Sequence, residues 1–459
     1  MNKRELGASF RDPSGSVYYE DSILYRKINH CYKEDYELFF SSGLYDELVS
    51  SNSIIPHVEV KDETVPAYKI IKPEAIPFIS YPYEWCFSQL KEAALLTLKI
   101  QKLALKHGMS LKDCSFYNVQ FLGFRPVFID TLSFEKHSDN RPWTAYGQFC
   151  RHFLAPLALM GIVDVRLGQL LKSYIDGLPL DLAVSLLPRS CRFNIGLLMH
   201  IYMHSKAQKS GAGTFKTVGK AENRKFGINS FYGLVESLES AVRGIKWRPL
   251  KTDWADYYSK RESYSCQGAD YKKKVVEDVI VKISPRLVCD LGANTGLYSR
   301  IPSSRGIYTI SSDFDPACIE GNYLYALEHK DSKILPLLLD VVNPSPGIGW
   351  ENRERDSFLE RGPFDLVIAL ALVHHLAISN NLPLRKISDF LKKISKNLLI
   401  EFVPKDDDMV KEMLVLREDI FKEYTRENFE NELAKDFILS QAVKINDSKR
   451  VLYLMRRKE

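Results

Sequence analysis

A loop with two glycines, Asp290-Leu-Gly-Ala-Asn-Thr-Gly296, contains the residues of this chain best suited to hold a ligand. It follows an apolar run, 286–289, that has the length of one buried strand. Glycine has no Cβ atom, so it lets the backbone turn sharply and lets a ligand approach closely. A nucleotide-binding α/β unit begins with such a strand, an acidic residue and a glycine turn. One such loop is weak evidence, because small residues are common in turns.

Further acidic residues lie where later apolar runs end. Asp313 ends a run that begins at Gly306, and it lies 23 residues after Asp290. A carboxylate roughly 20 residues beyond a glycine turn is placed to accept hydrogen bonds from ribose hydroxyls. Asp340 and Glu401 end two more apolar runs. The series therefore predicts several carboxylates at the ends of neighbouring strands.

The elements that would position these residues alternate between strands and helices. Alternation of this kind predicts a parallel sheet with helices on both faces, and such a sheet binds ligands at the carboxyl ends of its strands. The predicted elements are, in order, strand 286–289, strand 306–312, helix 316–329, strand 334–339, strand 364–373, helix 383–396 and strand 397–400.

The series resembles the class I S-adenosylmethionine-dependent methyltransferases over residues 271–459. The resemblance implies an α/β, Rossmann-like methyltransferase fold with a mostly parallel sheet, in which 437–444 and 450–455 would form a terminal antiparallel hairpin. It also implies S-adenosyl-L-methionine as the cofactor. By this resemblance the cofactor-binding residues are Asp290, Gly292, Ala293, Asn294 and Gly296 for the methionine part, Asp313 for the ribose, Asp340 near the adenine amino group and Ala369 beside the transferred methyl group.

Two shorter stretches, 343–350 and 401–407, resemble more narrowly the bacterial methyltransferases of the host-specific nodulation protein type. This finer resemblance supports the fold more than it defines a substrate. The first stretch is rich in proline and glycine, so we expect a stiff loop over the pocket, with Trp350 as a candidate substrate platform.

Rossmann dehydrogenases are the competing interpretation of the glycine loop. They use the pattern Gly-x-Gly-x-x-Gly, whereas this chain has only the two glycines of Gly292-Ala-Asn-Thr-Gly296. The sequence therefore favours S-adenosylmethionine over a dinucleotide.

Three residues are candidates for catalysis. Methyl transfer needs the donor and the acceptor in line, and a neutral acceptor must lose a proton. His374 and His375 follow the fourth strand, beside the expected methyl position, and a histidine can take a proton near neutral pH. Hydrogen bonding and packing are the alternative roles for these histidines. Glu401 is the third candidate, either to orient an amine or to pair with a histidine.

Three residues in the N-terminal half have a spacing that resembles the catalytic loop of kinases: Asp113, Asn118 and Asp130. The resemblance implies Asp113 as the base and the other two residues as magnesium ligands. The residue two positions before Asp113 is Leu111, where many kinases have histidine, and Asp130 is not followed by Phe-Gly. Whether these residues bind ATP and magnesium stays open.

Upstream residues would form the small lobe of such a kinase-like domain. A turn at 12–15 would separate two strands, and Lys27 would bind phosphate and pair with Glu34 or Glu37. Only Gly15 stands where kinases have a glycine-rich loop over the phosphates, which indicates a degenerate site. An unrelated α+β domain is the alternative interpretation.

We predict three parts: an N-terminal α+β domain at 1–245, for which a kinase-like fold is one interpretation, a linker or lid at 246–270, and a methyltransferase domain at 271–459. As a lid, the linker would turn Tyr258, Arg261 and Tyr264 toward the cofactor carboxylate or the substrate. A segment rich in Gly, Ser and Lys, 205–230, is either a solvated loop or a patch for an anionic partner.

The composition is that of a globular protein, with 45% hydrophobic and 26% charged residues among 459. The net charge of +5 is small for this length, so it does not by itself indicate nucleic acid, and it does not exclude it. The eight cysteines include no Cys-x-x-Cys pair, so we expect no metal site and a reducing, cytoplasmic location. The longest apolar stretch, 153–163, is shorter than the roughly 20 residues of a membrane span.

The leading hypothesis is an S-adenosylmethionine-dependent methyltransferase with an N-terminal domain that recognises a substrate or partner. The acceptor is unidentified, with a small molecule or a glycan favoured. One alternative is a bifunctional kinase-methyltransferase that modifies a glycan or a small metabolite. The other is a non-catalytic adaptor.

Overall fold

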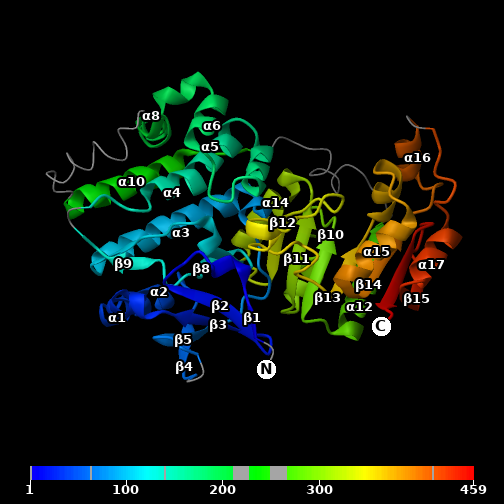
Figure 1. Ribbon diagram of the computed structural model, residues 1–459. Helices are drawn as coiled ribbons and strands as arrows, with labels where there is room; N and C mark the ends of the chain where they lie inside the picture. The colour runs from blue at the N-terminus through cyan, green and yellow to red at the C-terminus, as the bar shows by residue number, and fades with distance from the viewer. Residues whose placement is uncertain (1–2, 63–64, 139–140, 210–226, 249–265, 416–417) are drawn as a thin grey trace. The chain divides into compact units, whose positions relative to one another are not determined.

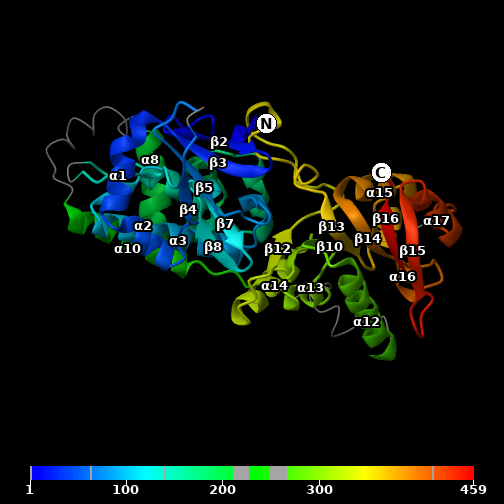
Figure 2. The same ribbon diagram turned by 90° about the horizontal axis from the view of Figure 1, so that it is seen from below.

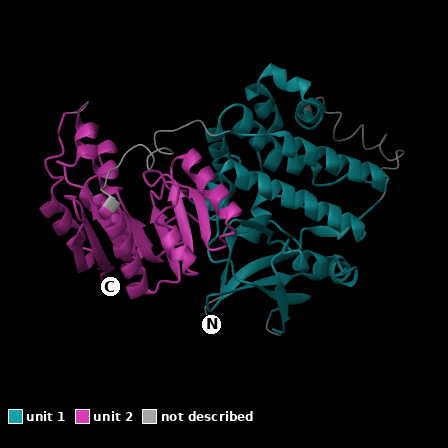
Figure 3. Cartoon of the chain, turned by 180° about the vertical axis from the view of Figure 1, so that it is seen from behind, with its two compact units in different colours: residues 1–248, 347–355 teal, residues 249–346, 356–459 magenta. Residues whose placement is uncertain are grey.

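The computed structural model describes residues 3–62, 65–138, 141–209, 227–248, 266–415 and 418–459. The chain divides into two compact units (Figure 3). The N-terminal unit comprises Met1–Arg248 and Gly347–Arg355, and the C-terminal unit comprises Pro249–Pro346 and Asp356–Glu459. The predicted lid residues Tyr258, Arg261 and Tyr264, and most of the basic segment 205–230, lie outside the described residues.

Seven strands form the central sheet of the C-terminal unit: β10 (Leu287–Leu291), β11 (Tyr308–Asp313), β12 (Ile334–Leu338), β13 (Phe364–Ala369), β14 (Ser395–Phe402), β15 (Phe437–Lys444) and β16 (Val451–Arg457). Their order is β12-β11-β10-β13-β14-β16-β15 (Figures 1 and 2). The first five strands in this order are parallel, and β16 is antiparallel to both β14 and β15. The predicted Rossmann-like methyltransferase fold, with its terminal antiparallel hairpin, is confirmed.

Both faces of this sheet are covered, which explains why its parallel strands are apolar along their length. Helix α12 (Cys266–Ile283) lies on one face, where Val276 and Ile280 pack against Leu366 of β13. Val367, the next residue of β13, is also fully buried and points to the opposite face. The other helices of this unit are α13 (Arg300–Ser304), α14 (Pro316–Glu328), α15 (Leu384–Ile394), α16 (Asp408–Leu414) and α17 (Arg426–Ala434), with a π-helical turn at His375–Ser379.

Several predicted boundaries differ from the structure by one or more residues, and the ends of β13 and α15 show the physical reasons. The strand predicted to reach residue 373 ends at Ala369, because Ala371 has a left-handed backbone conformation (φ +49°) that a strand does not contain. The helix predicted to reach residue 396 ends at Ile394, because Ser395 is extended and pairs with Phe364 in the sheet.

The N-terminal unit begins with a five-stranded antiparallel sheet, and its mixture of strands and helices confirms the α+β class. The strands are β1 (Lys3–Glu5), β2 (Gly15–Glu20), β3 (Ile23–Ile28), β4 (His57–Val60) and β5 (Lys69–Pro73), and the accompanying helices are α1 (Lys33–Ser41) and α2 (Leu44–Ser50). The order is β1-β2-β3-β5-β4. Tyr36 of α1 packs against Ile28 and Ile71, so α1 covers one face of this sheet.

The rest of the N-terminal unit is mainly helical and is interrupted by two short hairpins. The hairpins pair β6 (Met109–Leu111) with β9 (Phe134–Lys136) and β7 (Val119–Leu122) with β8 (Arg125–Phe128). The helices are α3 (Phe87–Lys106), α4 (Tyr146–Phe149), α5 (Ala155–Ile162), α6 (Leu180–Leu186), α7 (Ile195–Leu197), α8 (His204–Lys209) and α10 (Ile228–Gly244), with π-helical turns at Cys150–Leu154 and Leu198–Met203. No helix in the described part of the chain is both long and apolar enough to cross a bilayer.

The segment Gly347–Arg355, hereafter the inserted segment, packs in the N-terminal unit although its chain neighbours on both sides belong to the C-terminal unit. The buried carboxylate of Glu354 accepts hydrogen bonds of 2.6 and 3.1 Å from Arg11. The guanidinium of Arg355 lies 4.0 Å from the ring centre of Tyr117. The sequence predicted a single loop at 343–350, whereas in the structure residues 343–346 belong to the C-terminal unit and residues 347–350 to the N-terminal unit. Trp350 lies in the inserted segment and is 66% exposed.

Candidate cofactor site

Asp290 lies in β10 and is almost fully buried. The Ser299 hydroxyl donates a hydrogen bond of 2.6 Å to its carboxylate, and the Ser312 hydroxyl donates one of 2.9 Å to its backbone carbonyl. Burial raises the pKa of Asp290 to about 7, although the bond from Ser299 acts in the opposite direction. A cation beside this carboxylate would offset its lost hydration and lower that pKa.

The glycine loop after β10 needs glycine at both predicted positions. Gly292 and Gly296 have left-handed backbone conformations, with φ of +71° and +83°. A Cβ atom at Gly296 would lie 2.5 Å from the side-chain oxygen of Asn322, and one at Gly292 would lie 3.2 Å from Leu372. The second contact places the glycine loop beside the segment that follows β13. The loop therefore lies where two strand ends meet.

Asp313 ties the end of β11 to the glycine loop. Its Oδ2 atom accepts a hydrogen bond of 2.8 Å from the backbone N–H of Asn294, and its Oδ1 atom accepts one of 3.0 Å from that of Asp315. The N–H of Ala293 donates to the carbonyl of Ser312 at 2.9 Å. Burial raises the pKa of Asp313 to about 6. The carboxylate is therefore mostly ionised at neutral pH and is able to accept hydrogen bonds from hydroxyl groups.

Asp340 continues this edge beyond β12 and, unlike the other two aspartates, is exposed. The N–H of Leu339 donates a hydrogen bond of 2.8 Å to the carbonyl of Asp313, so the chain leaving β12 passes beside the end of β11. The carboxylate of Asp340 accepts a bond of 2.9 Å from the N–H of Val342. All three aspartates thus lie along one edge of the sheet, at the carboxyl ends of adjacent strands.

The same edge continues past Ala369, the buried last residue of β13. The N–H of Ala371 donates a hydrogen bond of 2.8 Å to the carboxylate of Glu401, at the end of β14. Lys272 donates to the same oxygen at 2.7 Å, and both side chains are almost fully buried. Glu401 therefore fixes α12 and the turn after β13, and its catalytic role stays a prediction.

Lys272 was not among the predicted site residues. It lies on the buried face of α12, three, four and seven residues before Val275, Val276 and Val279. Burial lowers the pKa of Lys272, while the charge of Glu401 raises it. The sequence signal that would have identified Lys272 is a lysine on the apolar face of an amphipathic helix. Such a lysine is buried when the helix packs, so it needs a buried partner.

His374 and His375 lie at the start of the π-helical turn, with ring centres 4.2 Å apart. Burial lowers the pKa of His374 well below its usual value and that of His375 to about 4, so both imidazoles are neutral. The Nδ1 atom of His374 is buried and has no hydrogen-bond partner among the described residues. Because a buried polar atom without a partner is costly, this nitrogen is well suited to accept a hydrogen bond or a proton from a ligand.

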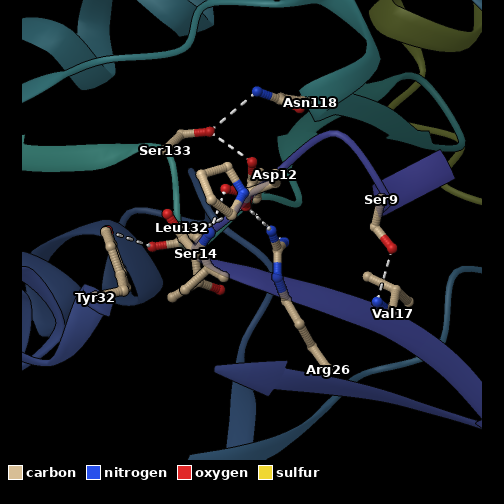
Figure 4. A network of polar contacts seen from close by, with 12 residues as sticks. Ser9, Asp12, Ser14, Val17, Arg26, Tyr32, Asn118, Leu132 and Ser133 are labelled. Carbon is tan, nitrogen blue, oxygen red and sulfur yellow. Dashed lines mark hydrogen bonds and ion pairs between the residues drawn. The ribbon is translucent and has the colours of Figure 1, made fainter. Parts of the chain in front are cut away.

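The three N-terminal residues with kinase-like spacing are linked by hydrogen bonds, and Figure 4 shows Asn118 beside Ser133. Asn118 donates a hydrogen bond of 3.0 Å to the Ser133 hydroxyl, which donates one of 2.7 Å to Asp130. Asn118 also hydrogen-bonds to Asp113, whose pKa is raised by burial and by the charge of Asp130. In the described ranges, no group of three or more His, Cys, Asp or Glu side chains is placed to hold a metal ion.

Arg26, rather than Lys27, faces this cluster from β3. Its guanidinium lies 2.5 Å from the carboxylate of Asp130. Neighbouring residues of a strand point to opposite faces, so Lys27 is turned away from this cluster, and its role as the phosphate-binding residue stays a prediction. The predicted partners Glu34 and Glu37 have exposed side chains, and neither forms an ion pair with Lys27 within the described residues.

No family model matches the sequence. Nodulation protein NoeA of Rhizobium meliloti (strain 1021) is 33% identical to the chain over 461 residues, which cover 99% of the chain and 96% of NoeA. The chain belongs to the NoeA family. The predicted resemblance to nodulation proteins is thereby confirmed.

Solved structures resemble parts of this NoeA family member at lower identity. The bifunctional kinase-methyltransferase WbdD is 17% identical, with 44% of this chain and 42% of that chain covered and a TM-score of 0.30. The N-methyltransferase NodS from Bradyrhizobium japonicum WM9 is 12% identical, with 42% and 99% covered and a TM-score of 0.32. Magnesium protoporphyrin IX methyltransferase from Synechocystis PCC 6803, solved with bound SAH, is 16% identical, with 42% and 84% covered and a TM-score of 0.30. The match covers less than half of WbdD. The fold of the C-terminal unit is therefore assigned from the strand order of this chain.

The buried carboxyl group of Asp290 predicts a pH dependence of stability. The folded state holds this proton more tightly than the unfolded chain, so the group stabilises the fold below pH ~4. That contribution is lost as the pH rises through about 7. Between pH 5 and pH 8, we expect the free energy of unfolding of the wild type to fall by roughly 2–3 kcal/mol more than that of Asp290→Asn. Chemical denaturation followed by tryptophan fluorescence at both pH values measures the difference.

Asp340→Asn removes an exposed carboxylate, so its free energy of unfolding should change with pH as that of the wild type does. Equal changes with pH for Asp290→Asn and the wild type would contradict the account.

Proposed function

We propose that the C-terminal unit binds S-adenosyl-L-methionine and transfers its methyl group to an acceptor. The observation that carries this proposal is the placement of Asp290, Asp313 and Asp340 along one edge of the sheet, beside a glycine loop. Asp313 would accept hydrogen bonds from the ribose hydroxyls. Phe314, the next residue, is 56% exposed and offers an aromatic face to the adenine. Asp340 would accept a hydrogen bond from the adenine amino group.

The residues of the edge also suit the methionine part of the cofactor. Gly292 and Gly296 leave the loop backbone without side chains, so a ligand can lie against it. The carboxylate of Asp290 would attract the ammonium group of the methionine part. This positive charge would lower the raised pKa of Asp290. The bound cofactor would supply an electrophilic methyl group on a sulfonium.

His374 is the residue that we propose to assist the acceptor. Its imidazole is neutral, and its buried Nδ1 atom lacks a partner among the described residues, so it can accept a hydrogen bond from an acceptor hydroxyl or amine and take the proton as the new bond forms. His375 would help to hold this ring in place. Glu401, bonded to Ala371 and Lys272, would keep the turn before His374 in position.

The acceptor that we favour is a small molecule or a glycan, because the small net charge of +5 does not favour nucleic acid. The N-terminal unit would recognise this acceptor or a partner. Seven of the cysteines form no disulfide within the described residues, which fits action in the reducing cytoplasm. Mass spectrometry of a cell extract treated with the protein and isotope-labelled cofactor would identify the product.

Cofactor binding is testable with a matched pair of glycine variants. We expect isothermal titration of the wild type with S-adenosylhomocysteine to give one site, and Gly292→Ala to weaken it roughly tenfold or more, because the added methyl group narrows the approach to the loop. Gly306→Ala is the control, since Gly306 has a similar φ of +80° but open space around its Cβ position and lies before β11. A folded wild type that gives no heat, or equal losses in both variants, would contradict the proposal.

A second candidate function is nucleotide binding by the N-terminal unit, as in a kinase-methyltransferase. The observation that favours it is the series of hydrogen bonds that links Asp113 to Asn118, Asn118 to Ser133 and Ser133 to Asp130. The ion pair between Arg26 and Asp130 counts against this function. A magnesium ion at Asp130 would have to compete with the guanidinium for the same carboxylate. We therefore rank this function below methyl transfer.

ATP and magnesium together should stabilise the wild type if this second function holds. At a ligand concentration about 100 times the dissociation constant, the gain is about 2.7 kcal/mol. Asp130→Asn should abolish the rise in melting temperature, because it removes the metal ligand. Asp12→Asn should retain it, since Asp12 also pairs with Arg26, at 3.3 Å, but lies outside the three residues. An unchanged melting temperature of the wild type would remove this candidate.

A further inference from the structure

Five apolar side chains between residues 186 and 203 of the N-terminal unit are exposed, and they are hereafter called the apolar stripe. Single exposed apolar residues are common on protein surfaces, but a group of them marks an interaction site. The most exposed member, Phe193, is 91% exposed. The members are Leu186, Phe193, Ile195, Met199 and Met203.

One helix presents three members of the stripe at a spacing of four residues. It consists of α7, the π-helical turn Leu198–Met203 and α8, which follow one another without a break. Ile195, Met199 and Met203 share its exposed face, whereas Leu197 and Ile201 on the opposite face are buried. A helix that is apolar on both faces needs a partner on each. Within the described residues, the unit supplies a partner to only one of them.

Hydrogen bonds fix the helix that carries the stripe to the rest of the N-terminal unit, so the stripe is exposed on an ordered helix. His200 accepts or donates hydrogen bonds of 2.9 Å on both ring nitrogens, to Tyr146 and to Ser237. The side chain of Asn194 accepts a bond of 3.1 Å from the N–H of Leu197 and so caps the helix beside Phe193. Figure 1 shows α6 and α8 at the upper edge of the N-terminal unit.

The charged residues that neighbour the stripe in sequence, after Asp181 on α6, are cations. Arg189, Arg192 and Lys206 are exposed and lie before or after the stripe residues. The sequence contains no Asp or Glu between Asp181 and Glu222, although the chain has 58 acidic residues among 459. Exposed apolar side chains with cations beside them in sequence are typical of a helix that lies on an anionic bilayer surface.

We propose that the apolar stripe binds the surface of a membrane that contains anionic phospholipids. Phe193 and the helix residues would enter the boundary between headgroups and acyl chains, roughly 5–10 Å deep. Arg189, Arg192 and Lys206 would contact the lipid phosphates. The helix would lie in the interface and not cross the bilayer. This binding is independent of methyl transfer, and it would bring both units to a membrane surface.

Sedimentation of the full chain with vesicles tests this proposal. We expect binding to vesicles of phosphatidylcholine mixed with phosphatidylglycerol, weaker binding at high salt, and little binding to phosphatidylcholine alone. The double variant Phe193→Ser/Met203→Ser should lower the partition coefficient about tenfold or more, because it removes two inserted apolar side chains. Arg189→Gln and Lys206→Gln should each lower it about fivefold.

Two control variants separate the stripe from general surface properties. Val58→Ser removes an apolar side chain that is 61% exposed on β4, and Lys72→Gln removes an exposed cation on β5. Both should bind like the wild type, and the melting temperatures of all variants should show that they are folded. A wild type that binds no vesicles, or a stripe variant that binds like the wild type, would overturn the proposal. Light scattering that shows a dimer lost in Phe193→Ser, without vesicle binding, would assign the stripe to a second copy and also overturn it.

Discussion

Two carboxylates buried at the ends of adjacent parallel strands, Asp290 and Asp313, are the constraint on which the C-terminal unit depends. A buried carboxylate is costly unless hydrogen bonds or an opposite charge compensate it. Asp313 receives two backbone N–H groups, which fixes the glycine loop against β11. Within the described part of the chain, the carboxylate of Asp290 accepts a hydrogen bond from the Ser299 hydroxyl alone, and the charge of Asp313 raises its pKa further. Two carboxylates at this edge favour a ligand with hydroxyl groups, which would donate hydrogen bonds, and with a positive charge, which would stabilise the ionised form of Asp290.

Local sequence patterns were sufficient for most of this edge. The apolar runs before Asp313 and Asp340 predicted β11 and β12, because a parallel strand buried on both faces has no polar alternation. The need for glycine at 292 and 296 followed from the turn that the loop makes. Patterns were insufficient where a contact joins distant residues. The pair of Lys272 and Glu401 spans 129 positions, and neither residue type indicates the other.

The N-terminal unit shows the same division between local pattern and distant contact. The resemblance to a kinase catalytic loop brought Asp113, Asn118 and Asp130 together in the prediction, and the short hairpin between Asn118 and Asp130 lets them meet. Whether Arg26 or Lys27 faces them depended on the register of β3 within its sheet, and a shift of one residue reverses every side chain. The inserted segment could not be predicted from composition, since its place is fixed by the bond between Glu354 and Arg11, 343 positions apart.

A crystal structure of the protein grown with S-adenosylhomocysteine tests the central claim most directly. The account predicts the ribose hydroxyls within hydrogen-bond distance of the Asp313 carboxylate, the amino-acid part against the backbone of the glycine loop and the adenine beside Asp340. Ordered ligand at any other surface, or an empty strand edge at saturating ligand, would contradict it.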